Sequence, residues 1–179
     1  MILTGEEIRR QRRSGRIEMN PFNPQQLNPN SYDLTMGTTV GRYKEAILDA
    51  SVENAMAFHE MGPGGEVIEP GKIVLGHTVE VFGSDHFVPI VRAKSSVARL
   101  GLFIHVTADL VDIGWHGQLT LQLHAVQPLR VYPGMLVAQI TFWVPKGEIG
   151  LYDGKYQHST GPVASRMSAR HLEAKGETP

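Results

Sequence analysis

Cysteine is absent from the 179 residues of this chain, which excludes disulfide bonds, thiol catalysis and zinc sites with cysteine ligands. An excess of charge is also lacking, because 17 basic and 18 acidic residues leave a formal net charge of −1. An anion must therefore be bound by a local cluster, and no nucleic-acid partner is expected. Residues 1–7 lack the layout of a signal peptide, and no apolar run approaches membrane-spanning length. We expect a cytoplasmic protein without a membrane partner.

The length fits one domain, expected over residues 1–164, followed by a polar C-terminal tail over residues 165–179. Thr4 and Glu7 have the spacing of a capping box, Ile8 supplies an apolar face, and Gly15 is a natural stop. A short N-terminal helix is therefore predicted. Its four arginines have acidic residues nearby, at Glu6, Glu7 and Glu18, which favours a solvated or subunit-facing surface over a nucleic-acid site.

After residue 24 the apolar pattern changes to a period of two, interrupted by glycine and proline. Strands are predicted at residues 72–81, 87–92, 118–124 and 135–144, with turns at 62–65, 69–71 and 132–134. Short strands at regular spacing with few helices indicate an antiparallel sandwich or jelly roll.

Two segments carry candidate chemistry. Lys94, Ser95, Ser96 and Arg99 place two cations and two hydroxyls within six residues, which is the equipment for holding a triphosphate by charge-assisted hydrogen bonds. Residues 111–117 read Val-Asp-Ile-Gly-Trp-His-Gly and suggest a nucleoside pocket. The residues alone leave other interpretations open: the serines fit an ordinary turn, and the tryptophan fits a core or rim position.

Several further segments follow one another in the order of a known family. They are Met-Ile-Leu-Thr at 1–4, Gly-Arg-Ile at 15–17, Pro-Phe at 21–22, Leu-Asn-Pro-Asn-Ser-Tyr-Asp-Leu-Thr-Met-Gly at 27–37, Ser-Ser-Val-Ala-Arg-Leu-Gly-Leu at 95–102, Val-Thr-Ala at 106–108, Pro-Gly-Met at 133–135, Gly-Lys-Tyr at 154–156 and Gly-Pro-Val-Ala-Ser-Arg at 161–166. With 111–115, this series resembles the dCTP deaminases over nearly the whole chain. The resemblance implies a mainly β fold, the distorted antiparallel jelly roll (β-clip) that this family shares with trimeric dUTPases. It also implies a homotrimer with active sites between subunits.

The resemblance also implies roles for individual residues. It carries catalytic positions over to Ser95, Arg99, Asp112 and Gln122. The nucleotide-binding positions that it implies are Lys94, Ser95, Ser96, Arg99, Thr107, Ala108, Asp112, Trp115, Gln122, Lys155, Tyr156 and Thr160. Mg²⁺ is expected to bind through the triphosphate, with no metal ligands from the protein. Lys94 stands where the family normally has arginine, so the charge is kept and the bidentate fork is lost.

Gln122 is the departure with the largest chemical consequence. Deamination needs a carboxyl group that takes a proton from water and returns it to the base and the leaving ammonia, and dCTP deaminases use a glutamate in this strand. Glutamine has nearly the same shape but cannot accept that proton. Departures at His124, Gln157, Ser159 and Thr160 accompany it and indicate a divergent relative.

Three hypotheses follow. The resemblance favours a deoxynucleoside triphosphate-processing hydrolase of the dCTP deaminase type, which turns dCTP and water into dUTP and ammonia. The first alternative is a pyrophosphatase for dUTP or dCTP in which Asp112 activates water, and the second is a non-catalytic nucleotide-binding relative. A histidine could replace the missing base, and His105, His116 and His124 lie near the relevant segments, although structural roles are favoured for each. Metal ligation by these histidines is not favoured, because they lack the spacing of metal motifs.

Overall fold

The computed structural model describes residues 1–168. Most of the expected polar tail, residues 169–179, therefore lies outside the described residues. No described helix is long and apolar enough to cross a membrane.

Two short α-helices, a 3-10 turn and eleven strands make up the described chain. In chain order they are α1 (Gly5–Arg13), β1 (Glu18–Asn20), η1 (Pro24–Gln26), β2 (Tyr32–Thr35), β3 (Thr39–Tyr43), β4 (Met56–Glu60), β5 (Glu66–Ile68), β6 (Val74–Gly83), β7 (Val88–Ala93), α2 (Ser95–Ala98), β8 (Leu102–Phe103), β9 (His116–Ala125), β10 (Leu129–Val131) and β11 (Leu136–Trp143). The four predicted strands correspond to β6, β7, β9 and β11, with ends within two residues of those expected.

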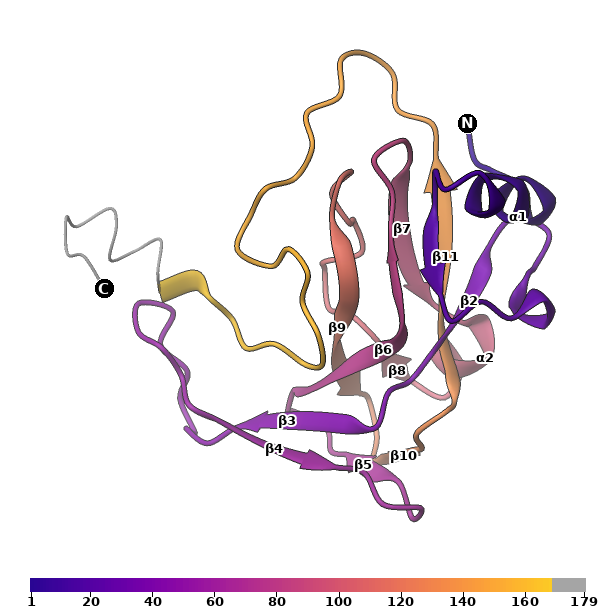
Figure 1. Cartoon of the computed structure of the whole chain (residues 1–179). Helices are drawn as coiled ribbons and strands as arrows, with labels where there is room; N and C mark the ends of the chain where they lie inside the picture. Colours follow the sequence, from indigo (N-terminus) through magenta and orange to yellow (C-terminus); the bar gives the residue numbers. More distant parts are fainter. Residues whose placement is uncertain (169–179) are drawn as a thin grey trace.

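The strands form three antiparallel sheets (Figure 1). The largest has the order β4-β3-β6-β9-β8, with β1 paired to β6 beside this path. A second sheet has the order β2-β11-β7, and β10 pairs with β5 in the third. The mainly β, antiparallel architecture with a short N-terminal helix is as predicted.

Helix α1 begins where the sequence indicated. The Thr4 side chain accepts a hydrogen bond from the Glu7 backbone N–H at 3.3 Å, and Ile8 is fully buried. The return half of the capping box is missing, because the Glu7 carboxylate instead accepts hydrogen bonds from Arg10 at 2.8 Å and Gln11 at 2.5 Å. The arginine-rich surface is thus partly neutralised within the helix.

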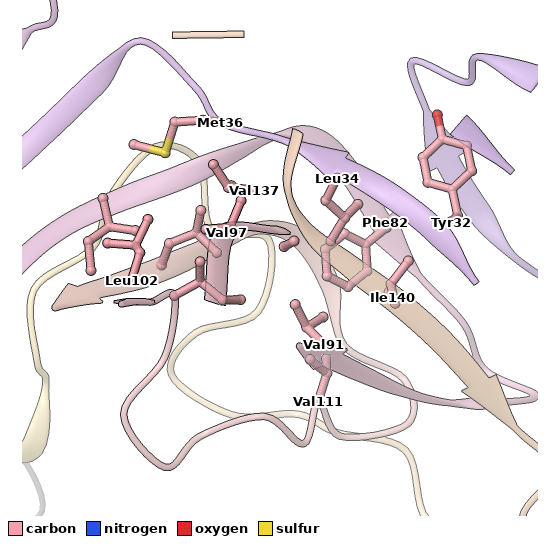
Figure 2. Close-up of a cluster of buried hydrophobic side chains, with 14 of the residues drawn as sticks. Tyr32, Leu34, Met36, Phe82, Val91, Val97, Leu102, Val111, Val137 and Ile140 are labelled. Atoms are coloured by element: carbon pink, nitrogen blue, oxygen red, sulfur yellow. The ribbon is translucent and has the colours of Figure 1, made fainter. Parts of the chain in front are cut away.

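The core lies between the first two sheets (Figure 2). Most of its side chains come from β11, β9, β6 and β2, with others from the segments around α2. The members labelled in the figure are Tyr32, Leu34, Met36, Phe82, Val91, Val97, Leu102, Val111, Val137 and Ile140. Val97 is the only buried residue of α2, and it fixes that short helix to the core while the two serines stay exposed.

Strand β9 connects the core to the candidate site. Leu121, Leu123 and Ala125 are buried on its core face, as alternation requires. The opposite face carries the half-buried Thr120 and Gln122. This polar face is the floor on which the candidate site is built.

Candidate functional site

A cavity of about 510 Å³ opens over the polar face of β9. A C-terminal segment, residues 152–165, crosses this face, and we call it the strap. In Figure 1 it runs beside β9 in orange and ends near the tips of β3 and β4. The cavity is lined by Tyr43, Leu48, Ile73, Leu75, Ala108, Leu110, Val111, Asp112, Trp115, Gln118, Leu119, Thr120, Gln122, Tyr152, Tyr156, Ser159, Val163, Ala164 and Ser165.

The turn at residues 111–115 forms one wall. The Trp115 N–H donates to the Asp112 carbonyl at 3.1 Å, and Gly114 adopts a φ of 89°. A Cβ at Gly114 would lie 2.8 Å from the Tyr152 nitrogen, so glycine satisfies both the turn and the close approach of the strap. The Asp-Ile-Gly sequence therefore has a structural reason as well as a chemical one.

Trp115 is a buried wall residue. Its indole packs edge-on against Phe82, with ring centroids 5.3 Å apart, and its Nε1–H donates to the Tyr156 carbonyl at 2.7 Å. One side of the ring system is thus held by the core and its polar atom by the strap. The tryptophan fixes the shape of the cavity. Because it is buried, it also occupies a core position, which was the alternative that the sequence left open.

Asp112 lies at the rim with an exposed side chain. Within residues 1–168 its carboxylate has no hydrogen bond or ion pair, and it is the only carboxylate that lines the cavity. A free carboxylate at the rim can accept a proton from water or a hydrogen bond from a ligand hydroxyl.

Polar side chains of β9 bind the strap in sequence. Gln118 accepts from the Gly161 N–H at 2.8 Å and donates to the Val79 carbonyl at 3.1 Å. Thr120 Oγ1 accepts from the Val163 N–H at 3.0 Å. These side chains were not predicted as site residues, although their spacing of two and four residues from Gln122 already placed them on its face.

Gln157 fastens the strap to the turn. Its amide donates to the carbonyls of Gly114 at 2.7 Å and Tyr152 at 3.2 Å, and its oxygen accepts from the His116 N–H at 2.8 Å. Tyr156 lies beside it, with its hydroxyl accepting from the Arg166 N–H at 2.8 Å. The sequence marked Gln157 only as a departure from the family pattern.

The predicted phosphate turn is elsewhere on the chain. Ser95, Ser96 and Arg99 are exposed on or just after α2, and none of them lines the cavity. Figure 1 shows α2 and the strap on opposite sides of β9. Lys94 forms an ion pair with Asp33, which is 6% exposed. This ion pair anchors the start of α2 to β2. Lys94, which was predicted to bind phosphate, is therefore already paired with a carboxylate of its own chain.

The remaining predicted nucleotide-binding residues divide between the cavity and its surroundings. Ala108 and Tyr156 line the cavity together with Asp112, Trp115 and Gln122. The others do not line it and are exposed, namely Thr107, Lys155 and Thr160. Lys155 donates to the Arg166 carbonyl at 2.5 Å and so links the beginning of the strap to the residue that follows its end.

The three histidines lie outside this cavity. His105 lines a separate cavity of about 350 Å³ next to α2, and the His124 ring lies 6.1 Å from that of Phe103. His116 lies 2.6 Å from a Glu18 oxygen and 2.9 Å from an Asp85 oxygen. None of the three therefore supplies a cavity base in the described chain, and residues 1–168 contain no cluster of three or more metal-ligating side chains.

The Glu18–His116–Asp85 group is held together by charge. Partial burial works against protonation of the imidazole, but hydrogen bonds to Asp85 and Glu18 outweigh it and raise the pKa of His116. The backbone of His116 also forms hydrogen bonds with Gln157 and His158. The ion-paired group therefore helps to fix the end of the turn at 111–115 and its contact with the strap.

Comparison with known proteins gives a consistent result. The family model described as dCTP deaminase-like matches residues 2–144. A relative from Hathewaya histolytica named "dCTP deaminase, dUMP-forming" is 43% identical over 168 residues, which are 93% of this chain and 97% of the relative. A relative of the same name from Clostridium beijerinckii is 41% identical over 93% of this chain and 96% of its own length.

A solved structure has the same fold. The 2′-deoxycytidine 5′-triphosphate deaminase from Agrobacterium tumefaciens superposes with a TM-score of 0.64 and 20% sequence identity. The superposition covers 80% of this chain and 48% of that one, so the likeness concerns about half of the longer protein. It confirms the expected fold class.

Proposed function

The chain belongs to the dCTP deaminase-like family, and on that premise we propose that it is a hydrolase that binds dCTP or dUTP in the strap cavity and cleaves the triphosphate with water. The observation that carries this proposal is the make-up of the cavity wall. An aromatic residue, a free carboxylate and the amide of Gln122 meet there, on a scale suited to a nucleoside.

Two reactions are implied by the name of the curated relatives, because turning dCTP into dUMP replaces the C4 amino group by oxygen and removes two phosphates. The removal of the amino group needs a side chain that cycles a proton. Gln122, which stands where the resemblance expects the glutamate, cannot do so, and no histidine among the described residues lines the cavity. The one carboxylate that lines the described cavity, Asp112, lies in the turn at 111–115 and not on β9. The phosphate-releasing reaction is therefore the one this cavity supports best.

Asp112 is the proposed base. It takes a proton from a water molecule whose oxygen forms a bond to the α-phosphorus, the bond from that phosphorus to the bridging oxygen breaks, and pyrophosphate leaves. For dCTP the balance is dCTP and water giving dCMP and pyrophosphate. The exposed position and lack of a described protein partner suit the carboxylate to this task.

Mg²⁺ enters this proposal as part of the substrate. The ion would be held by the phosphate oxygens. Residues 1–168 have no cluster of three or more side chains that could ligate a metal. Bound to the phosphate oxygens, Mg²⁺ would neutralise charge on the phosphates. Among the described residues, Asp112 is the only carboxylate that lines the cavity.

Phosphate binding is proposed to come from a neighbouring copy in a homotrimer. Ser95, Ser96 and Arg99 are exposed and do not line the cavity of their own chain. A second copy would place these donors against the open rim at Asp112. The active site would then be completed only by assembly, as the resemblance implies.

A single assay tests the proposal. The full-length protein is incubated with dCTP or dUTP and Mg²⁺, and nucleotides, ammonia and pyrophosphate are resolved by mass and by coupled detection. We expect pyrophosphate with dCMP from dCTP, or with dUMP from dUTP. Binding without any product would leave only a nucleotide-binding role, and absence of binding would refute the proposed function.

Deamination is the second candidate, and the names of the relatives favour it. It predicts ammonia from dCTP. Restoring a carboxyl group by Gln122→Glu should then raise ammonia release at least about 10-fold, because general acid–base groups contribute about 100-fold or more. Ammonia from neither form would exclude deamination as the activity of this cavity.

A further inference from the structure

Gln122 has a fixed orientation in the cavity. Its Nε2–H donates to the carbonyl of Thr120 at 3.0 Å. Only the nitrogen of a carboxamide can pair with a carbonyl oxygen, so the chemistry of the contact decides which end of the amide is which. The oxygen Oε1 is therefore the end left for a ligand.

That oxygen is accessible. Within residues 1–168 it accepts no hydrogen bond from the protein, and it is not among the polar atoms buried without a partner. Because Gln122 lines the cavity, Oε1 presents a hydrogen-bond acceptor to whatever occupies it. A ligand group that donates a hydrogen bond pairs with this oxygen. A ligand group that can only accept, placed against the same oxygen, leaves both acceptors without a hydrogen bond.

Thr120 presents the opposite polarity. Its Oγ1 already accepts a hydrogen bond from the Val163 N–H at 3.0 Å, so its O–H is available to donate. Thr120 lines the same cavity and lies two residues from Gln122 on the same strand face. The floor thus offers an acceptor and a donor side by side, each oriented by a contact with the protein backbone.

We propose that Gln122 is a specificity-determining residue that selects a base with an exocyclic amino group. The cytosine edge offers an N4 amino donor next to the N3 acceptor, which complements the acceptor of Gln122 and the donor of Thr120. The uracil edge offers the O4 acceptor next to an N3–H donor, which opposes both. The inference rests on the proposed function, since it names the base for the same cavity.

Gln122 thereby has a role different from proton transfer. It holds the amino group of cytosine through Oε1 and leaves it in place, because the amide has no titratable proton with which to expel ammonia. Hydrolysis at the α-phosphorus then gives dCMP as the nucleotide product. This chain would differ in that respect from relatives whose name specifies dUMP.

The test measures binding apart from turnover. Full-length protein with Mg²⁺ is titrated calorimetrically with the α,β-imido triphosphates of deoxycytidine, deoxyuridine and the deoxynucleoside of 2-pyrimidinone, which keeps the N3 acceptor and lacks the amino group. We expect the cytosine compound to bind about 10- to 100-fold more tightly than the uracil compound, with the pyrimidinone between them.

Two variants assign the effect to Gln122. Gln122→Met keeps the size and removes the acceptor, so the cytosine and uracil affinities should fall within about threefold of each other. Gln122→Glu keeps an acceptor and should preserve the preference, which provides a second measurement if the methionine variant is unstable. The control Gln127→Met changes an exposed glutamine just beyond β9 and should leave the preference unchanged.

The outcomes separate the two proposals. Equal binding of the cytosine and uracil compounds by the unaltered protein would overturn the selection by Gln122 while leaving the proposed function in place. A preference that persists in Gln122→Met would also overturn it, because another residue must then read the amino group. Failure of the unaltered protein to bind any of the three compounds would refute the proposed function itself.

Discussion

At the scale of single residues, Asp112 is decisive because the described cavity has no other carboxylate. Asp112→Asn preserves the shape of the side chain and removes its capacity to accept a proton. We expect pyrophosphate release to fall by a factor of about 100 or more, the usual contribution of a general base, while the dissociation constant of an α,β-imido nucleotide changes by less than about threefold. Coupled pyrophosphate detection and calorimetry measure the two quantities.

A nearby aspartate provides the matched control. Asp153 is exposed on the strap and does not line the cavity, so Asp153→Asn should keep both rate and affinity. An Asp112→Asn variant that stays fully active as a hydrolase would contradict the assignment of Asp112 as the base.

His116 predicts a dependence of stability on pH. Its pKa in the folded protein is raised above the ordinary value of 6.5 by the carboxylates of Asp85 and Glu18, against the opposing effect of burial. The native state therefore binds the proton more tightly, and this stabilisation is complete below about pH 6 and is lost as the pH rises through the raised pKa. His116→Gln should thus lower the melting temperature at about pH 5.5–6 and lower it progressively less toward about pH 9.

Circular dichroism melting curves across this range measure the effect. His86→Gln, which changes an exposed imidazole outside the ion-paired group, serves as the control. A melting-temperature deficit of His116→Gln that is the same at every pH would show that packing, and not the proton, is responsible.

At the scale of elements, the strap depends on side chains that fasten it to β9 and to the turn at 111–115. Gln157 makes two of these hydrogen bonds, to Gly114 and His116, and a third within the strap to Tyr152. Gln157→Ala should lower the free energy that holds the strap against β9 and the turn by about 1–3 kcal/mol, because each hydrogen bond contributes a net amount of about 1 kcal/mol. We expect hydrogen exchange at the Gly161 and Val163 amides to accelerate by about 10-fold or more.

Hydrogen-exchange mass spectrometry resolves this change by segment. The exchange of β6 and of the core face of β9 should remain as in the unaltered protein, and Gln127→Ala should alter neither region. Unchanged protection of residues 159–163 in Gln157→Ala would show that Gln118 and Thr120 hold the strap without the help of Gln157.

The elements also show what sequence can and cannot predict. Alternation predicted β9 and β11 because each buries one face. The resemblance named Asp112 and Trp115, which lie in the turn at 111–115, and Gln122, which lies on the polar face of β9, and all three line the cavity. Alternation did not predict strand β2, because three consecutive residues of this strand are buried. It did not predict strand β4 because β4 is an edge strand with one half-buried and four exposed residues.

The strap was beyond prediction for a different physical reason. Residues 152–165 have no period of two or of 3.6, and their position is set by hydrogen bonds to side chains about 40 positions earlier in the chain. No local sequence pattern therefore predicted the hydrogen bonds that Tyr43 and Gln157 make with distant segments. Lys94 likewise could be recognised as a cation near phosphate-type residues, but its pairing with Asp33 depends on the association of β2 with β11 and β7.

At the scale of the whole molecule, the separation of α2 from the cavity is the main structural fact to be explained. Arg99 and Asp112 belong to one proposed site, yet of the two only Asp112 lines the cavity of its own chain. In a cyclic trimer the turn of one copy can face the cavity of the next. Arg99→Ala should then remove most of the affinity for triphosphate, and Asp112→Asn should remove most of the turnover. In each site the two residues would come from different copies.

Mixing the two inactive variants tests this arrangement. In a trimer that contains both variants, one site combines the intact Asp112 of an Arg99→Ala copy with the intact Arg99 of an Asp112→Asn copy, so random assembly at equal amounts restores about a quarter of the sites. Pyrophosphate release by co-refolded variants should therefore reach about a quarter of the unaltered rate, while each variant refolded alone stays inactive. A mixture as inactive as its parts would place both residues in one chain's site and contradict assembly between copies.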